Sequence, residues 1–192
     1  MQRIGILGGT FNPIHIGHLA IAQMAQEKVG LDKVIFIPAF IPPHKTVKHL
    51  AAAKDRLAMA RLAISDNPSF QVSDYEIKKG GRSFSINTVR HFRKVYAKKA
   101  KLYFIIGGDS LGQLPTWKQI DDLLKLVTFI AVNRPGYQRN HKAIKHISVE
   151  SELNIASSDL RKRITQGKTI KYLVPDKVIR YINQHKIYIA SR

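Results

Sequence analysis

Two histidines and several glycines lie close together near the N-terminus of this 192-residue chain. Gly8 and Gly9 carry no side chain, so the backbone can pass close to a phosphate group at these positions. His15 and His18 are three residues apart and therefore share one face of a helical turn, where imidazoles can donate hydrogen bonds to phosphate oxygens. Gly17 lies at the expected helix entrance, where free backbone N–H groups and the helix dipole attract anions. This pattern predicts a cradle for nucleotide phosphates.

The cradle differs from the two familiar glycine-rich phosphate loops. The first expected strand is followed by neither Gly-x-Gly-x-x-Gly nor Gly-Lys-Ser/Thr. One alternative is that the two histidines bind a metal ion. That site would need a third ligand, and no acidic residue precedes Glu27 in the chain. Another alternative is a plain turn with unrelated histidines, which the strand–glycine–helix context argues against. We therefore expect no metal ligands from the protein.

A second group of anion-binding residue types lies late in the chain. Ser157 and Ser158 open an expected helix, and Arg161 follows three residues later. A hydroxyl, free backbone N–H groups and a guanidinium group can converge there on one anion. Taken alone, an ordinary helix N-cap at Ser158 with a solvated arginine explains these residues better.

Three further residues are candidates for holding a ligand. Asp109 follows a buried strand and a glycine pair, where a carboxylate can bind a ribose hydroxyl, cap the next helix, or both. Trp117 is the only tryptophan and follows Pro115 in an expected loop. Its flat ring suits stacking on a ligand ring, although a half-buried packing role fits equally well. Lys45 lies in a proline-rich loop that can fold over the site, or it is one more surface lysine.

Alternating strands and helices must position these residues. Each expected strand is a short buried run or an alternating segment, and each expected helix has apolar residues at helical spacing. The sequence therefore predicts one α/β domain over residues 1–192, a doubly wound parallel sheet with a small helical extension at about 155–192. The expected strands are residues 3–7, 33–37, 70–72, 75–77, 102–106, 127–132 and 147–149, and the expected helices are residues 18–29, 51–64, 86–99, 120–125, 158–165 and 175–185.

The composition excludes several classes of protein. The chain has no cysteine, so a disulfide framework, a thiolate zinc site and a cysteine nucleophile are all excluded. No apolar run reaches the ~20 residues that a membrane-spanning helix needs. The glycine pair follows the first apolar residues too early for a signal peptide. We expect a cytoplasmic protein.

The charge is strongly positive, at +19. Residues 133–192 hold thirteen basic and four acidic residues, so the last third is the more basic part. Nucleic acid and anionic small molecules are the partners that such a charge suggests. The chain lacks a stripe of interleaved aromatic and basic residues, however, and a solvated basic surface is the simplest interpretation.

Four motifs in order resemble those of a known family. Residues 8–18, Gly-Gly-Thr-Phe-Asn-Pro-Ile-His-Ile-Gly-His, look like the signature of the nucleotidylyltransferase superfamily, with its T/HxGH element at residues 15–18. Residues 42–45 (Pro-Pro-His-Lys) and 108–111 (Gly-Asp-Ser-Leu), followed by Trp117, resemble the bacterial nicotinate-mononucleotide adenylyltransferases. Residues 155–161 are similar to their late Ile-Ser-Ser-Thr-x-Ile-Arg motif. The chain departs from the family at Asn12, where aspartate is usual, and at Ala156 and Ser158.

The resemblance implies a Rossmann-like fold and a reaction. The reaction transfers the adenylyl group of ATP, carried with Mg²⁺, to nicotinate mononucleotide, giving nicotinate adenine dinucleotide and pyrophosphate in NAD biosynthesis. It also implies possible assembly into a homo-oligomer. It assigns catalysis to His18, His15, Arg161 and Lys45, ATP binding to Gly8, Gly9, Thr10, Phe11, His15, Gly17, His18, Gly107, Asp109, Ser157, Ser158 and Arg161, and pyridine-nucleotide binding to Ser85, Asp109, Trp117, Arg134 and Lys45.

Other functions stay open at this point. A sister enzyme acting on nicotinamide mononucleotide or on pantetheine phosphate, or a cytidylyltransferase, would share the first motif. A basic nucleic-acid-binding protein is the alternative from another class.

Overall fold

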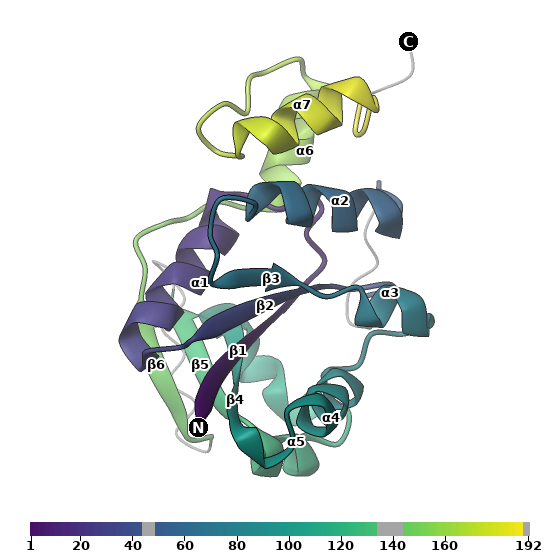
Figure 1. Cartoon of the computed structure of the whole chain (residues 1–192). Helices are drawn as coiled ribbons and strands as arrows, with labels where there is room; N and C mark the ends of the chain where they lie inside the picture. Colours follow the sequence, from purple (N-terminus) through teal and green to yellow (C-terminus); the bar gives the residue numbers. More distant parts are fainter. Residues whose placement is uncertain (44–48, 134–143, 190–192) are drawn as a thin grey trace.

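A computed structural model describes residues 1–43, 49–133 and 144–189, and its centre is a six-stranded parallel sheet (Figure 1). The order across the sheet is β3-β2-β1-β4-β5-β6, and every neighbouring pair is parallel. The chain therefore winds outward from β1 in one direction and from β4 in the other, which confirms the doubly wound α/β prediction. The strands are β1 (Gln2–Gly9), β2 (Lys33–Pro38), β3 (Phe70–Val72), β4 (Ala100–Gly107), β5 (Thr128–Asn133) and β6 (His146–Glu150).

Helices cover both faces of the sheet, because the strands are apolar on both sides. Along β1, Ile4 and Ile6 pack on one face and Leu7 packs on the other. Buried residues of α1 and α2 pack on the Leu7 face, and those of α4 and α5 pack on the opposite face. In Figure 1, α2 lies above the sheet with α1 at its left, and α4 and α5 lie below it. The helices are α1 (Ile16–Val29), α2 (Ala53–Ala63), α3 (Tyr75–Lys79), α4 (Ser85–Tyr96), α5 (Ile120–Leu126), α6 (Ser157–Thr165) and α7 (Asp176–Gln184), with short 3-10 helices η1 (Ala97–Lys99) and η2 (Gly108–Thr116).

The last two helices continue the upper core rather than standing apart from it. Figure 1 shows α7 above α2, with α6 beside it. Leu160 of α6 and Val178 and Ile182 of α7 are buried in the same apolar cluster as Met59 of α2. Tyr181 of α7 also donates a hydrogen bond to Asp55 Oδ1 of α2 at 3.0 Å. The C-terminal segment is thereby held against the layer that carries α1.

Most expected elements lie where the patterns place them. Helix α1 ends at Gly30, as expected, and this glycine adopts the left-handed conformation (φ 65°) that ends many helices. The strand expected at 75–77 is wrong, because the chain forms the helix α3 there. Three residues with apolar side chains at alternate positions fit a strand or a helical turn equally well. Burial of Glu76 against Thr88 of α4 favours the helix.

No helix among the described residues is long and apolar enough to span a membrane.

Candidate active site

A cleft of about 540 Å³ opens where β1 and β4 end, which is the point at which the winding of the sheet reverses. Ligands of open α/β sheets bind at such a point. The cleft is lined by loops from both ends of the chain. Twelve of the sequence-predicted residues line it: Gly8, Gly9, Thr10, Phe11, His15, His18, Ser85, Gly107, Trp117, Ser157, Ser158 and Arg161.

Four predicted residues stand apart from that set. Gly17 is buried behind the cleft in the first turn of α1. Lys45, Arg134 and the side chain of Asp109 lie outside the described part of the structure, so their roles stay predictions. The backbone of Asp109 lies in the first turn of η2, whose N-cap is Gly107. The alternative in which Asp109 caps that helix is therefore wrong.

The two histidines form one unit at the start of α1. His15 is the N-cap and is only 1% exposed, while His18 is half-buried. Their rings lie 3.7 Å apart between centroids, and the edge of the Phe11 ring contacts His18 at 5.0 Å. The backbone N–H of His15 donates to His18 Nδ1 at 3.3 Å. Because Nδ1 accepts this bond, the neutral His18 ring carries its proton on Nε2 and presents that nitrogen as a donor.

Two glycines make room for these rings. A Cβ on Gly9 would lie 2.6 Å from the ring of Phe11, which packs directly over the backbone there. A Cβ on Gly17 would lie 3.0 Å from His15 Nδ1. The contact at Gly9 is closer than real side chains show, and the contact at Gly17 is tighter than most, so these glycines let the aromatic rings lie against the main chain. At Gly9 the structure shows the close approach of an aromatic ring, and the close approach of a phosphate there stays a prediction.

The backbone carbonyls of the loop between β1 and α1 are held by donors from elsewhere in the chain. Arg56 of α2 donates to Thr10 O at 2.8 Å, Arg161 of α6 donates to Asn12 O at 2.9 Å, and Ser157 donates to Pro13 O at 3.0 Å. These carbonyl oxygens accept hydrogen bonds from protein donors. Their partial negative charge is thereby offset, which favours binding of an anion by the loop. Hydrogen bonds thus join the loop to α6, although 149 positions separate Asn12 from Arg161.

Arg56 is a site-supporting residue that sequence reasoning missed. It is 1% exposed, and it also donates to Ala51 O at 3.0 Å and Phe40 O at 3.1 Å. No ion pair among the described residues includes it. Burial lowers the pKa of the Arg56 guanidinium, yet arginine stays charged in proteins. The only available signal was its position in the apolar spacing of the expected helix. That spacing gave no indication that a charged residue would be buried there.

The helix α6 starts one residue earlier than predicted. Its N-cap is Ala156, so Ser157 and Ser158 occupy its first turn, and the prediction that Ser158 is the N-cap is wrong. The Ser157 hydroxyl donates to Pro13 O, so the start of the helix is tied to the loop between β1 and α1. Ser158 and Arg161 line the cleft from this turn, and the first N–H groups of the helix lie beside them.

The opposite wall of the cleft is aromatic. Trp117 is half-buried and makes edge contacts with Phe104 at 5.9 Å and Phe129 at 6.3 Å between ring centroids. It therefore packs on the core and lines the cleft at the same time, so both interpretations of Trp117 are compatible with its position. Next to it, Lys118 lies over the Phe84 ring at 4.7 Å and also lines the cleft. Lys118 was not predicted from the sequence, in which its place beside the tryptophan was the available signal.

A buried carboxyl group supports the same wall. Glu76 accepts a short hydrogen bond from the Thr88 hydroxyl and lines the cleft with Ser83 and Ser85. Ser83 in turn accepts from the backbone N–H of Phe40 at 2.9 Å. Burial raises the pKa of Glu76, and hydrogen bonds from Thr88 and Ser83 act in the opposite direction. This group was not predicted, because an isolated acidic residue in an expected strand gives no signal.

The donor set of the cleft suits anions and a flat ring. Across residues 1–43, 49–133 and 144–189, no three His, Asp or Glu side chains gather into a site for a metal ion.

Comparisons with known proteins agree on one family. The family model described as cytidylyltransferase-like matches residues 6–163. A Thermoanaerobacter protein named "Probable nicotinate-nucleotide adenylyltransferase" is 42% identical, over 97% of this chain and 94% of its own length. An Oceanobacillus iheyensis protein of the same name is 40% identical over 100% of both chains.

Among solved structures, the nicotinic acid mononucleotide adenylyltransferase of Plasmodium falciparum complexed with NaAD is similar with a TM-score of 0.83. Its identity is 18%, and the match covers 98% of both chains. This likeness concerns the fold.

Proposed function

The chain belongs to the cytidylyltransferase-like family and, within it, to the nicotinate-nucleotide adenylyltransferases, and we propose that its cleft joins ATP to nicotinate mononucleotide through the residues described above. The products are nicotinate adenine dinucleotide and pyrophosphate, as in NAD biosynthesis. One observation carries the assignment of the site. The His15–His18 unit, the first turn of α6 and the aromatic wall at Trp117 all line one cleft.

The reaction is a direct transfer between two anions. An oxygen of the 5′-phosphate of nicotinate mononucleotide attacks the α-phosphorus of ATP. A new P–O bond forms, and the bond from the α-phosphorus to the bridging oxygen of the β-phosphate breaks. The electron pair of that bond leaves with pyrophosphate, so no protein nucleophile and no external oxidant or reductant is needed. Catalysis then consists of positioning the two phosphates and stabilising their charge.

The residues of the cleft divide this work between them. The Nε2–H of His18 donates to the α-phosphate region, where charge changes most during transfer, and His15 supports His18 through their ring contact. Arg161, Ser158 and the first N–H groups of α6 bind the β- and γ-phosphates, which leave together. Lys45 contributes a further positive charge, as the family resemblance implies.

Mg²⁺ enters with ATP as part of the substrate. Besides the Glu76 carboxyl group, which accepts from Thr88, the polar groups that line the described cleft include imidazoles, hydroxyls, a guanidinium group and backbone N–H groups, which suit phosphate oxygens better than they suit Mg²⁺. The metal therefore binds the triphosphate, where it neutralises charge, and the protein holds the phosphates around it.

The pyridine ring binds at the other end of the cleft. Trp117 offers a flat face for stacking, and Ser85 offers a hydroxyl at the edge of the ring. Lys118 lines this wall as a cation, and Arg134 and Asp109 are expected near the nicotinate carboxylate and the ribose. A negative ring substituent is thereby favoured over a neutral amide.

The test measures pyrophosphate release with ATP and Mg²⁺, comparing nicotinate mononucleotide, nicotinamide mononucleotide and pantetheine phosphate side by side. We expect release with the acid to be much faster than with the other two. Comparable rates with nicotinate mononucleotide and nicotinamide mononucleotide would contradict the proposed preference for the acid. Pyrophosphate release only with pantetheine phosphate would overturn the substrate assignment.

A further inference from the structure

Asn12 lies in the loop that forms the proposed phosphate cradle, and both polar atoms of its side chain are hydrogen-bonded. Asn12 is 2% exposed. Its Nδ2 donates to His49 O at 3.2 Å, and its Oδ1 accepts from the backbone N–H of Ala51 at 3.0 Å and from the Tyr188 hydroxyl at 2.7 Å. With Arg161 on its backbone oxygen, four separate segments meet at this residue. We call this set of contacts the Asn12 junction.

Tyr188 is the most distant member of the Asn12 junction along the chain. It follows α7 and lies 176 positions after Asn12. Burial raises the pKa of its hydroxyl, while the nearby guanidinium groups of Arg161 and Arg56 act in the opposite direction. The hydroxyl thus stays protonated at neutral pH and acts as the donor in this bond. A residue near the C-terminus in this way contacts the loop of the proposed phosphate cradle.

The identity of residue 12 matters for this arrangement. An amide has both a donor and an acceptor, so Asn12 satisfies His49 O on one side and two donors on the other. A carboxylate would place an oxygen against His49 O and would also offset the charge of Arg161. Among the described residues, no ion pair includes Arg161 or Arg56, so both guanidinium groups keep the cradle positive.

We infer that Tyr188 is a positioning residue for the proposed reaction: through Asn12 it holds the phosphate cradle and Arg161 in the geometry that binds the triphosphate of ATP. This inference rests on the proposed function, since it concerns the same cleft. It places the C-terminal segment after α7 among the parts of the chain that determine ATP binding. Neither the motifs nor the cleft lining include Tyr188, because it acts one contact away from the ligand.

The experiment compares Tyr188→Phe with Tyr181→Phe, which is a matched control. Each change removes one hydroxyl hydrogen bond between the C-terminal segment and the rest of the protein, but Tyr181 bonds to Asp55 of α2 and not to the cradle. We expect Tyr188→Phe to lower kcat/KM for ATP about fivefold, the size of one net hydrogen bond, with KM for nicotinate mononucleotide changed less than about twofold. Both variants should lower the melting temperature by similar amounts, because each loses one hydrogen bond. Tyr181→Phe should leave kcat/KM for ATP and KM for nicotinate mononucleotide unchanged.

Two further measurements separate positioning from a general structural effect. In an Asn12→Ala background, Tyr188→Phe should add no further loss, because the residue through which it acts is gone. In an Asn12→Asp background, which also serves if the alanine variant does not fold, the loss should be larger than in the wild type, because a hydroxyl binds a carboxylate more strongly than an amide. Two results would overturn the inference. One is that Tyr188→Phe lowers kcat/KM for ATP in the alanine background as much as in the wild type. The other is that its effect in the aspartate background equals its effect in the wild type.

Calorimetric binding of α,β-methylene-ATP distinguishes this inference from the proposed function. Tyr188→Phe should weaken binding of this analogue about fivefold relative to wild type, whichever nucleotide the enzyme accepts as second substrate. Unchanged binding together with unchanged kinetics would mean that Tyr188 only stabilises the fold. Absence of pyrophosphate release in the wild type would instead contradict the proposed function and leave the binding measurement to decide the role of Tyr188.

Discussion

His18 is the side chain on which the proposed chemistry depends most. The Phe11 and His15 rings and the His15 N–H all contact it, so its Nε2 is held in one direction. We expect His18→Ala to lower kcat by about 10²-fold or more, as for the loss of one transition-state donor. The melting temperature should change little, since the ring is only half-buried.

The control for this variant is His185→Ala, which removes an exposed histidine at the end of α7. It should show wild-type kinetics. Near-normal turnover of His18→Ala would remove His18 from the mechanism.

Trp117 should affect one substrate far more than the other. Its ring lines the cleft and packs edge-on against Phe104 and Phe129. We expect Trp117→Ala to raise KM for nicotinate mononucleotide at least about tenfold, because stacking on an aromatic face contributes about 1–3 kcal/mol per ring. KM for ATP should change less than about twofold. Trp117→Phe keeps a flat ring, so it should raise KM for nicotinate mononucleotide much less than Trp117→Ala does. Equal effects on both substrates would show that the tryptophan is only structural.

At the scale of residues, the sequence predicted many of those that line the cleft and missed those that hold the cleft loops in place. His15, His18 and Trp117 could be predicted because their types and spacing have a direct chemical meaning. Arg56 and Tyr188 could not, because an arginine that binds three carbonyls and a tyrosine that reaches back 176 positions depend on contacts that only the fold creates.

The short connection between β3 and α4 is the element whose stability should depend most clearly on pH. Helix α3 buries Glu76 against Thr88 of α4, and burial raises the pKa of Glu76 above its usual value. A carboxyl group with a raised pKa in the folded state favours folding while it is protonated. That contribution is complete below the unfolded pKa and is lost as pH rises through the folded pKa.

Glu76→Gln should therefore become more stable relative to wild type as pH rises. The amide oxygen can still accept from Thr88, and no charge has to be buried. The measurement is the melting temperature of both proteins between pH 4 and pH 8. We expect the difference, variant minus wild type, to increase with pH. A difference that stays constant or decreases would show that Glu76 is stabilised as an anion.

At the scale of elements, buried strands that end at glycine or proline were the most predictable. β1, β2 and β4 are continuous apolar runs, and such runs have few alternatives in an α/β protein. The helix α3 was not predictable, since five residues give no periodicity. The start of α6 was missed by one residue, because Ser157 uses its hydroxyl for Pro13 of a distant loop rather than for its own helix.

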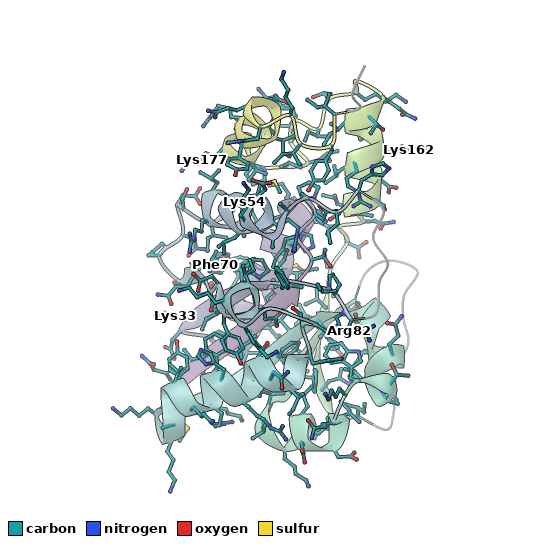
Figure 2. All side chains as sticks on the ribbon, turned by 90° about the vertical axis from the view of Figure 1, so that its right-hand side faces the viewer. Lys33, Lys54, Phe70, Arg82, Lys162 and Lys177 are labelled. Atoms are coloured by element: carbon teal, nitrogen blue, oxygen red, sulfur yellow. The ribbon has the colours of Figure 1, made fainter. Side chains whose placement is uncertain are left out.

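At the scale of the whole molecule, the net charge of +19 is opposite in sign to both proposed substrates, which are anions. Figure 2 labels Lys54, Lys162 and Lys177 in the part of the molecule formed by α2, α6 and α7. One domain over residues 1–192 stays a prediction, which the shared core of α2, α6 and α7 supports. The alternative of a primary nucleic-acid-binding role has no further support in the described residues.

The charge predicts a dependence on salt. Raising the ionic strength from about 10 mM to about 150 mM shortens the screening length from about 30 Å to about 8 Å. We expect KM for both ATP and nicotinate mononucleotide to rise several-fold over this range, with kcat nearly constant, because long-range attraction of the substrates is lost while contacts in the cleft persist. A fall in kcat at constant KM would show that salt acts on the catalytic contacts instead.

The most direct test of the proposed reaction follows the oxygen atoms of the acceptor phosphate. Nicotinate mononucleotide labelled with ¹⁸O on its phosphate is incubated with ATP, Mg²⁺ and the wild-type enzyme. The masses of both products are then measured by mass spectrometry. Attack by this phosphate on the α-phosphorus of ATP keeps every labelled oxygen in the dinucleotide and leaves the pyrophosphate unlabelled. Label in pyrophosphate, or no labelled dinucleotide at all, would contradict adenylyl transfer in this cleft.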